Sequence, residues 1–288
     1  MNFDKNTGIL KMLDDFNRPA TYKANFTYEH NHPKLIELAD SYNLKQIAGG
    51  GDDLSKILNL LHWLSANTFH SPDYPGGIPF NALDLLEYTF NKGIESGVNC
   101  QCLATILTEC YLSIGLKART TYIMPFNPYD SDNHVVTIVF SEQFNKWIMV
   151  DPSYSAYMKN ENDLILSPWE AREALANQWL IKINPEYNYN GSTTVEPPDA
   201  YIEYIAKDIF FFFCGEKSTF LANPFEPAAA GKLLTLAPLG FDVKKYMIEN
   251  VKWRIRQYGE NEGILNWLRE TEKMEINYIS FADFTMNP

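Results

Sequence analysis

One part of the sequence constrains the fold more than any other: a cysteine-bearing helix pattern that follows Asn99. Apolar residues recur along it at the spacing of a helix with one buried face. They are Leu103, Ile106, Leu107, Cys110 and Ile114. Asn99 is a residue type that caps helix starts, and Gly115 is one that ends helices. We therefore predict a helix from Cys100 to about Gly115, with one face packed on a core.

Three strand patterns follow this helix directly, at residues 118–124, 134–140 and 146–151. The short polar turn "SEQFN" joins the last two. Two other helix patterns precede the cysteine helix, one from about Asp53 and one from Asn81 to Gly93. Helices followed by consecutive strands are typical of an α+β protein and not of alternating βαβ units. The sequence thus predicts an α+β fold in which the cysteine helix packs on an antiparallel sheet.

The chain of 288 residues is long enough to bury a large core without disulfides or metal. We expect an N-terminal segment (1–50) packed on a central core (51–160). A mixed α/β C-terminal extension (161–288) is expected to belong to the same compact unit. Periodicity also predicts a strand at 22–28, helices at 167–180 and 242–258, and a strand-like end at 275–286.

Charge and hydropathy exclude several classes of partner. The net charge is −12, from 24 basic and 36 acidic residues, and no basic cluster is present to neutralise phosphates. We therefore expect no nucleic-acid surface and no binding to anionic membranes. The longest wholly apolar run, Ile209 to Cys214, is too short to span a bilayer, and the start of the sequence lacks a signal-peptide pattern. Four cysteines do not suggest a disulfide framework, so a cytoplasmic protein is expected.

Two of the four cysteines, Cys100 and Cys102, stand one residue apart at the start of the helix pattern. At about 100° per residue their side chains point roughly 200° apart, so they do not address one ligand together. Cys100 lies in the first turn, where the helix dipole and unpaired N–H groups favour a thiolate and can hold an oxyanion. Cys102, Cys110 and Cys214 are expected to be packing residues.

Metal binding is the competing interpretation of these cysteines. A structural zinc site needs about four ligands, and no second Cys/His cluster is spaced to complete a site with Cys100, Cys102 and a histidine. His30 and His32 share one face of a strand pattern, but no third ligand is evident, which favours a solvated strand end. We therefore expect no metal and no cofactor.

The strand hairpin after the helix supplies two more candidate residues. His134 opens the strand "HVVTIVF" and Asp151 closes the strand "KWIMVD". If residue 140 faces residue 145 across the turn, the same register places His134 directly opposite Asp151. A carboxylate within reach of an imidazole fixes its tautomer and stabilises its charged form. With Cys100 packed on this sheet, the parts of a Cys–His–Asp nucleophilic triad are present.

The segment 97–157 resembles the transglutaminase-like superfamily of papain-related cysteine enzymes. The resemblance rests on Cys100 and Ala104, on "LSIGLKAR" at the helix end, and on "DNHVV" and "KWIMVDPSYSAY" in the strands. It implies a papain/transglutaminase-like fold with a nucleophilic Cys100, with His134 as general base and acid, and with Asp151 orienting the histidine. Val135 and Val136 replace the aromatic that usually follows this histidine in the family, so the substrate does not carry over.

The triad and the resemblance together predict a cysteine enzyme that acts on amide bonds. Cys100 would form a thioester with the acyl group of a glutamine side chain or a peptide bond, in a protein or peptide substrate. Transfer to water makes a hydrolase and transfer to an amine makes an acyltransferase; hydrolysis is favoured because no amine-acceptor site is evident. Trp63, Tyr154 and Tyr157 are candidates to line the cleft, with core packing as their simpler explanation. An inactive binding or scaffold module of the same fold is the alternative.

Overall fold

A mostly antiparallel sheet forms the centre of the protein in the computed structural model, which describes residues 3–73, 76–191, 197–223, 227–286 and 288. Its strand order is β10-β9-β7-β2-β3-β4. The strands are β2 (Ala118–Met124), β3 (His134–Ser141), β4 (Lys146–Val150), β7 (Phe211–Gly215), β9 (Leu233–Leu236) and β10 (Asn277–Tyr278). Neighbouring strands are antiparallel except β9 and β10. The middle and the C-terminal part of the chain therefore share one sheet, joined where β2 pairs with β7.

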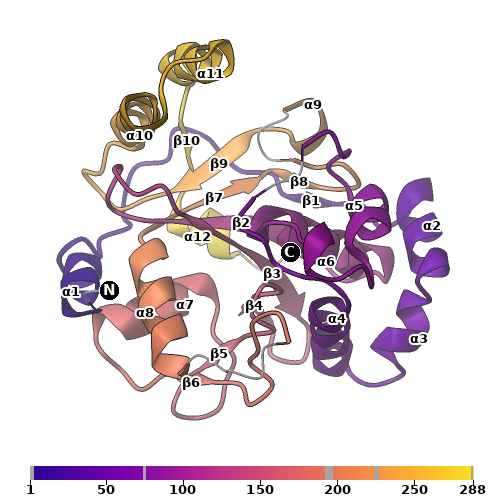
Figure 1. Ribbon diagram of the computed structural model, residues 1–288. Helices are drawn as coiled ribbons and strands as arrows, with labels where there is room; N and C mark the ends of the chain where they lie inside the picture. Colours follow the sequence, from indigo (N-terminus) through magenta and orange to yellow (C-terminus); the bar gives the residue numbers. More distant parts are fainter. Residues whose placement is uncertain (1–2, 74–75, 192–196, 224–226, 287) are drawn as a thin grey trace.

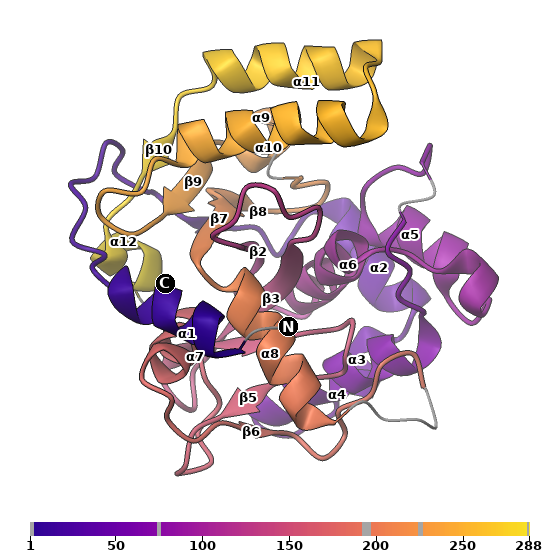
Figure 2. The same ribbon diagram turned by 60° about the vertical axis from the view of Figure 1, so that its left-hand side comes forward.

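Helices surround this sheet in three groups (Figures 1 and 2). One group lies together on one side and comprises α2 (Pro33–Ser41), α3 (Leu44–Ala48), α4 (Asp53–Asn67), α5 (Ala82–Thr89) and α6 (Cys100–Ser113). A second comprises α1 (Phe3–Met12), α7 (Pro168–Ala176) and α8 (Pro198–Asp208). The third is a pair that lies side by side near β9, α10 (Val243–Tyr258) and α11 (Glu262–Lys273). In the described parts of the chain, no helix combines the length and apolar character needed to cross a membrane.

Short elements complete the fold. They are the pair β1 (Thr27–Tyr28) and β8 (Lys217–Ser218), the pair β5 (Met158–Lys159) and β6 (Lys182–Ile183), the 3-10 turn η1 (Ile94–Ser96), and the helices α9 (Pro227–Ala230) and α12 (Phe281–Thr285). The pair β1 and β8 ties the N-terminal segment to the C-terminal half of the chain.

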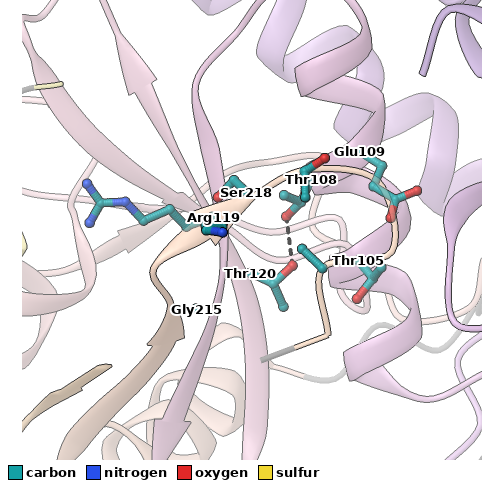
Figure 3. Close-up of a pocket in the computed structure, with 10 residues that line it drawn as sticks. Thr105, Thr108, Glu109, Arg119, Thr120, Gly215 and Ser218 are labelled. Atoms are coloured by element: carbon teal, nitrogen blue, oxygen red, sulfur yellow. Dashed lines mark hydrogen bonds between the residues drawn. The ribbon is translucent and has the colours of Figure 1, made fainter. Parts of the chain in front are cut away.

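A small polar cavity of about 10 Å³ lies between α6 and the strands beside it (Figure 3). Thr120 on β2 donates a hydrogen bond of 3.0 Å to Thr108 on α6 at its wall. Glu109 is buried there and accepts hydrogen bonds from the backbone N–H groups of Ala82 (2.8 Å) and Leu221 (3.0 Å). Burial raises the pKa of the Glu109 carboxyl to about 8. Helix α6 therefore carries a buried acid in its interior turns.

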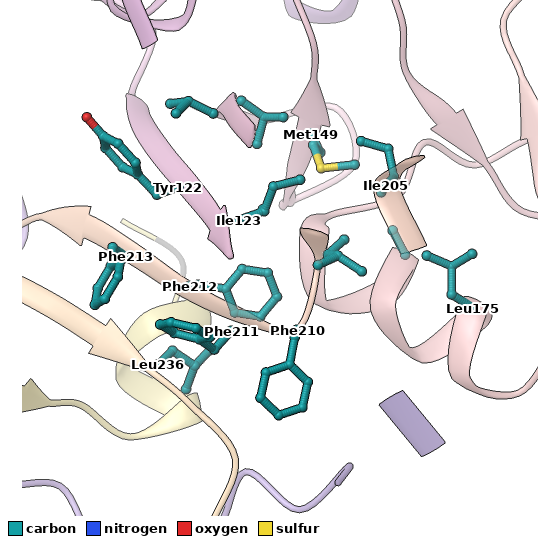
Figure 4. Close-up of a cluster of buried hydrophobic side chains, with 14 of the residues drawn as sticks. Tyr122, Ile123, Met149, Leu175, Ile205, Phe210, Phe211, Phe212, Phe213 and Leu236 are labelled. Atoms are coloured by element: carbon teal, nitrogen blue, oxygen red, sulfur yellow. The ribbon is translucent and has the colours of Figure 1, made fainter. Parts of the chain in front are cut away.

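The larger apolar core is built around the phenylalanine run 210–213 (Figure 4). Three of these rings belong to β7, and their neighbours come from β2, β4, α7, α8 and β9. A second core joins α2 to α6 and the opposite faces of the strands, and it includes Cys102 and Cys110. Helix α6 lies between the two cores, because Cys100 and Ala104 belong to the first and Cys102 to the second.

The predicted α+β class is confirmed, and most elements begin where the sequence placed them. Helix α6 starts at Cys100 with Asn99 as its cap, and β2 spans 118–124. Other boundaries were wrong. Asp53, a residue type that caps helices and the expected cap of α4, is instead its first residue, and Asp52 is the cap. The helix predicted to Gly93 ends at Thr89, and the one predicted to residue 180 ends at Ala176.

Two predicted strands were largely wrong. In the strand predicted at 22–28 the burial alternates as expected, but only Thr27 and Tyr28 pair with another strand. The end at 275–286 holds the short β10 and then the helix α12, because Ser280 caps a helix start there. The alternation of apolar residues shows which side chains are buried, whereas strand pairing depends on a partner strand that lies far away in the sequence.

The predicted register of the hairpin β3–β4 was wrong by two residues. Phe140 pairs with Trp147 and Ser141 with Lys146, because Ser141 belongs to the strand and the turn is the four residues that follow it. His134 therefore does not lie directly opposite Asp151. A shift of two residues keeps both side chains on the same face, since strand side chains alternate with a period of two. The two residues become diagonal neighbours and not a direct pair.

Candidate active site

Cys100 occupies the first position of α6 and is half-buried. The Asn99 side chain accepts a hydrogen bond of 3.0 Å from the backbone N–H of Cys102, which fixes the start of the helix. The first N–H groups of a helix have no intrahelical partner, so those of Cys100 and Gln101 point out of the helix end beside the thiol. This end of the helix can hold a negative charge next to Cys100.

Cys102 lies in the other core and is fully buried. Burial raises the pKa of its thiol to about 12, which keeps it protonated at neutral pH. Cys110 and Cys214 are also fully buried, and burial raises the pKa of each. Of the four free cysteines, Cys100 is the one with solvent exposure.

His134 and Asp151 form a buried hydrogen-bonded pair at the end of the β3–β4 hairpin. The His134 Nε2 lies 2.6 Å from the Asp151 Oδ2, and both side chains are 1% exposed. The Asp151 Oδ1 accepts a hydrogen bond of 2.9 Å from the backbone N–H of Ser153, and its Oδ2 accepts one of 3.0 Å from the Tyr201 hydroxyl. Three donors therefore hold this carboxylate in place.

The charged form of His134 is favoured by its surroundings. Burial alone would lower the pKa of the imidazole, but the charge and hydrogen bond of Asp151, together with a hydrogen bond to Cys100, raise that pKa well above its ordinary value. The Cys100 thiol thus lies within hydrogen-bonding reach of a histidine that Asp151 orients from the other side. These residues come from the start of α6, the start of β3 and the position directly after β4, and the structure brings them together.

Two tyrosines of α8 complete this cluster, and the sequence did not predict either of them. Tyr201 bonds Asp151, and the Tyr204 hydroxyl lies 3.3 Å from the His134 Nδ1. They stand three positions apart in the sequence, so both lie on one face of the helix. The spacing in "AYIEYIAKD" could have identified an aromatic helix face, but nothing in the sequence indicates which element that face covers.

The three predicted cleft residues lie in different places. Tyr154 stands beside the site, with its ring centroid 6.1 Å from that of His134 and 4.9 Å from that of Tyr201. Trp63 packs instead between the rings of Tyr42 and Phe90 in the second core. Tyr157 is buried in the second core, beneath Lys159. A substrate-binding role for Tyr154, Trp63 and Tyr157 stays a prediction.

His70 lies next to the segment that leads into α6, and ring contacts through Tyr189 and Tyr154 link it to His134. It forms a parallel bridge with Val98, and its Nδ1 lies 2.9 Å from the Tyr189 hydroxyl. Burial and the neighbouring His134 charge lower the pKa of His70 to about 4, so its imidazole is neutral. The site therefore combines one charged and one neutral histidine, with tyrosine rings between them.

The other two histidines singled out in the sequence serve structural contacts. His32 caps α2 by accepting a hydrogen bond from the backbone N–H of Lys34, and the His30 Nδ1 lies 3.1 Å from the Leu112 carbonyl oxygen. Within the residues that the structure describes, no group of three or more His, Cys, Asp or Glu side chains is placed to hold a metal ion.

Comparisons with known proteins give little beyond this geometry. No protein-family model matches the sequence, and no curated protein matches it at a significant level. A solved structure from Cytophaga hutchinsonii, described as a "putative cysteine protease", has a TM-score of 0.33 and 17% sequence identity over 56% of this chain. The match spans 49% of that chain, about half its length. A likeness of this extent assigns neither a fold nor an activity.

Proposed function

We propose that this protein is a cysteine enzyme of the transglutaminase-like, papain-related type that cleaves amide bonds through a thioester on Cys100. The observation that carries the proposal is the chain of contacts from Cys100 through His134 to Asp151. A half-buried thiol at a helix start, an imidazole whose pKa is raised, and a carboxylate held by three donors are the components that nucleophilic catalysis by cysteine requires.

Acylation would proceed from the Cys100 thiolate and the His134 imidazolium. The sulfur attacks the amide carbonyl carbon, and the carbonyl oxygen becomes an oxyanion beside the free N–H groups at the start of α6. The C–N bond then breaks, and the departing nitrogen takes the proton from the His134 Nδ1. The products are an amine, a thioester on Cys100 and a neutral imidazole.

Deacylation would run the same steps with water. Water attacks the thioester carbon and gives a proton to the His134 Nδ1, and the C–S bond breaks to restore the thiolate and imidazolium. An amine in place of water would give acyl transfer. We favour hydrolysis of a protein or peptide substrate, at a glutamine side chain or a peptide bond, because the described side chains that contact His134 beside Cys100 are tyrosines, which identify no amine-acceptor site.

We further propose that residues 51–160 are the catalytic core and that the extension 161–288 completes it. The support is that Tyr201 and Tyr204 of the extension contact Asp151 and His134. A reducing, cytoplasmic compartment would keep the Cys100 thiol free for this chemistry.

Alkylation with iodoacetamide near neutral pH, followed by mass spectrometry, tests the nucleophile. We expect selective modification of Cys100, with the buried Cys102, Cys110 and Cys214 as internal controls. His134→Gln should slow that modification while its circular dichroism spectrum stays unchanged. Equal labelling of all four cysteines, unaffected by His134→Gln, would falsify the proposal.

Incubation with peptides of β-casein tests the reaction and separates the enzyme from a scaffold module. An acid quench should trap acylated Cys100. Released ammonia would identify a glutamine side chain as the donor, and new peptide amino termini would identify a peptide bond. Rapid alkylation of Cys100 with no trapped acyl group and neither product would support the inactive scaffold.

A further inference from the structure

The Tyr204 hydroxyl stands at the one nitrogen of His134 that the proposed reaction uses. The Nε2 of His134 is hydrogen-bonded to the Asp151 Oδ2 at 2.6 Å, so proton exchange with the reactants takes place at the Nδ1. The Tyr204 oxygen lies 3.3 Å from that Nδ1, and the two rings are nearly perpendicular, with centroids 5.2 Å apart. The Cys100 thiol lies close enough to the same histidine to raise its pKa. The hydroxyl is therefore a neighbour of both reacting groups.

Exposure places Tyr204 on the substrate side of the site. His134, Asp151 and Tyr201 are buried, whereas Cys100, Tyr204 and Tyr154 keep partial exposure to solvent. A molecule that reaches the Cys100 sulfur from solvent must pass these exposed side chains. Tyr201, one helical turn away, is buried against Asp151 and supports the carboxylate from behind.

The hydroxyl of Tyr204 is a neutral group at the pH where such an enzyme works. Burial raises the pKa of Tyr204 far above its ordinary value, and the carboxylates of Asp208 and Asp132 and the nearby Cys100 raise it further. A neutral phenol can both accept and donate a hydrogen bond, so it can hold a water molecule without competing for its proton.

We infer that Tyr204 is a catalytic residue that holds the attacking water against the His134 Nδ1 during deacylation. The inference rests on the proposed function and adds a residue to its second half-reaction. In the acyl-enzyme the imidazole is neutral and its Nδ1 is an acceptor. One O–H of the water points to the Nδ1, the other points to the Tyr204 oxygen, and the water lone pair is left facing the thioester carbon. Two fixed partners thus orient the nucleophile.

The proton balance of the step is complete with these groups. The water oxygen forms a bond to the thioester carbon as one water proton moves to the His134 Nδ1. The C–S bond breaks, its electron pair stays on the Cys100 sulfur, and the acyl group leaves as a carboxylic acid. Tyr204 keeps its own proton throughout, so its role is orientation and not proton transfer.

Acetylation by p-nitrophenyl acetate separates the two half-reactions, because the nitrophenolate leaves without a proton from His134. The release of nitrophenolate measures acylation, and the mass of the intact protein over time measures the lifetime of acetyl-Cys100. We expect Tyr204→Phe to keep the acylation rate within about 2-fold and to lengthen the acetyl-Cys100 lifetime on the order of 10-fold to 100-fold, the range for one lost oriented hydrogen bond.

Two matched variants keep the result specific. Tyr258→Phe removes an exposed hydroxyl (68% exposed) and should change neither step. Tyr201→Phe removes the hydroxyl that bonds Asp151 and should slow both steps together, since it acts through the orientation of His134. Hydroxylamine, a nucleophile that does not depend on an oriented water, should release the acetyl group from Tyr204→Phe as fast as from the wild type.

The outcomes divide cleanly between the two proposals. An equal acetyl-Cys100 lifetime in wild type and Tyr204→Phe overturns the role of Tyr204 and leaves the proposed function standing. Equal slowing of acylation and deacylation in Tyr204→Phe also overturns it, because that pattern belongs to a residue that only supports the fold. If wild-type Cys100 is never acetylated, the proposed function fails and the assignment of Tyr204 fails with it.

Discussion

Helix α6 carries polar chemistry at two places, and the two are built in different ways. At its first turn Cys100 faces His134, whose imidazole is bonded to Asp151. Nine residues further on, Glu109 is 1% exposed, and its two oxygens accept hydrogen bonds from backbone N–H groups beside the small cavity. One cluster pairs a histidine with an acid, and the other surrounds an acid with neutral donors.

The difference shows what burial does with and without a charged partner. At Glu109 burial outweighs two hydrogen bonds and raises the pKa of the carboxyl to about 8, which favours the neutral acid. At His134 burial is outweighed by Asp151, so the charged imidazolium is favoured. A charge is thus kept on β3 beside the start of α6, whereas the interior turns of α6 carry a neutral acid.

Substitution of the two neighbouring cysteines gives the largest expected contrast. Cys100→Ala should abolish the trapped acyl group altogether, because no other described thiol reaches His134. Cys102→Ala should leave acylation within a few-fold and instead lower the free energy of unfolding by about 1–2 kcal/mol, because it opens a small cavity in the second core. Acyl trapping and denaturant unfolding measure the two effects. An acyl group that survives in Cys100→Ala, or vanishes in Cys102→Ala, would reverse the assignment.

Asp151→Asn tests whether the carboxylate is what makes the first cluster reactive. The variant keeps the shape of the side chain but removes its charge, so amide cleavage should fall by about 10²–10⁴-fold. Because His134 has a raised folded-state pKa, its contribution to stability is fully present below about pH 6.5 and is lost as the pH rises through the folded value. That loss should disappear in Asp151→Asn. The free energy of unfolding of both proteins, measured between pH 5 and 9, tests this difference. The same pH profile in the wild type and in Asp151→Asn would count against the pairing of His134 with Asp151.

Glu109→Gln should act on stability and not on reactivity. The folded state holds the Glu109 proton up to about pH 8 and the unfolded state releases it near 4.5, so stability contributed at this position falls as the pH rises between those values. The free energy of unfolding should fall by about 1.4 kcal/mol per pH unit in this range, and Glu109→Gln should lack this dependence on pH. Thermal melts across that range provide the measurement, with Cys100 alkylation as the control. A loss of Cys100 alkylation would mean that the two clusters are coupled.

Asn99→Ala, at the cap that directly precedes Cys100, should give the smallest effect. The loss of the helix cap should lower the free energy of unfolding by about 1 kcal/mol. The freed N–H of Cys102 should also loosen the first turn and slow Cys100 alkylation by a few-fold. Asn261→Ala, which removes the matching cap of α11 far from the site, is the control for stability alone. Equal alkylation rates in the two variants would separate the cap from the reactivity of Cys100.

The local half of this site could be predicted from the sequence because its parts are close together in the chain. The helix start at Cys100 and the strands that carry His134 and Asp151 follow from periodicity and capping within about fifty residues. The hairpin register was wrong because a single residue, Ser141, could belong either to the strand or to the turn. The face of the hairpin was still correct, since the error was an even number of residues.

The distant half could not be predicted, because it depends on how the C-terminal part of the chain returns to the sheet. Nothing local in "AYIEYIAKD" indicates that α8 covers His134, and nothing in the phenylalanine run indicates that β7 pairs with β2. Those contacts are set by burial across the sheet and not by residue spacing. The ring partners of Trp63, which are Tyr42 and Phe90, could not be predicted either, although its helix pattern favoured core packing.

The pairing of β2 with β7 has a consequence for the chain while it is being synthesised. Cys100 leaves the ribosome about a hundred residues before Tyr204, which at typical rates of synthesis is on the order of 5–20 s. During that interval β2 has an unpaired edge, and the helix that covers His134 does not yet exist. The nascent chain therefore carries its nucleophile for seconds before the site around it can close.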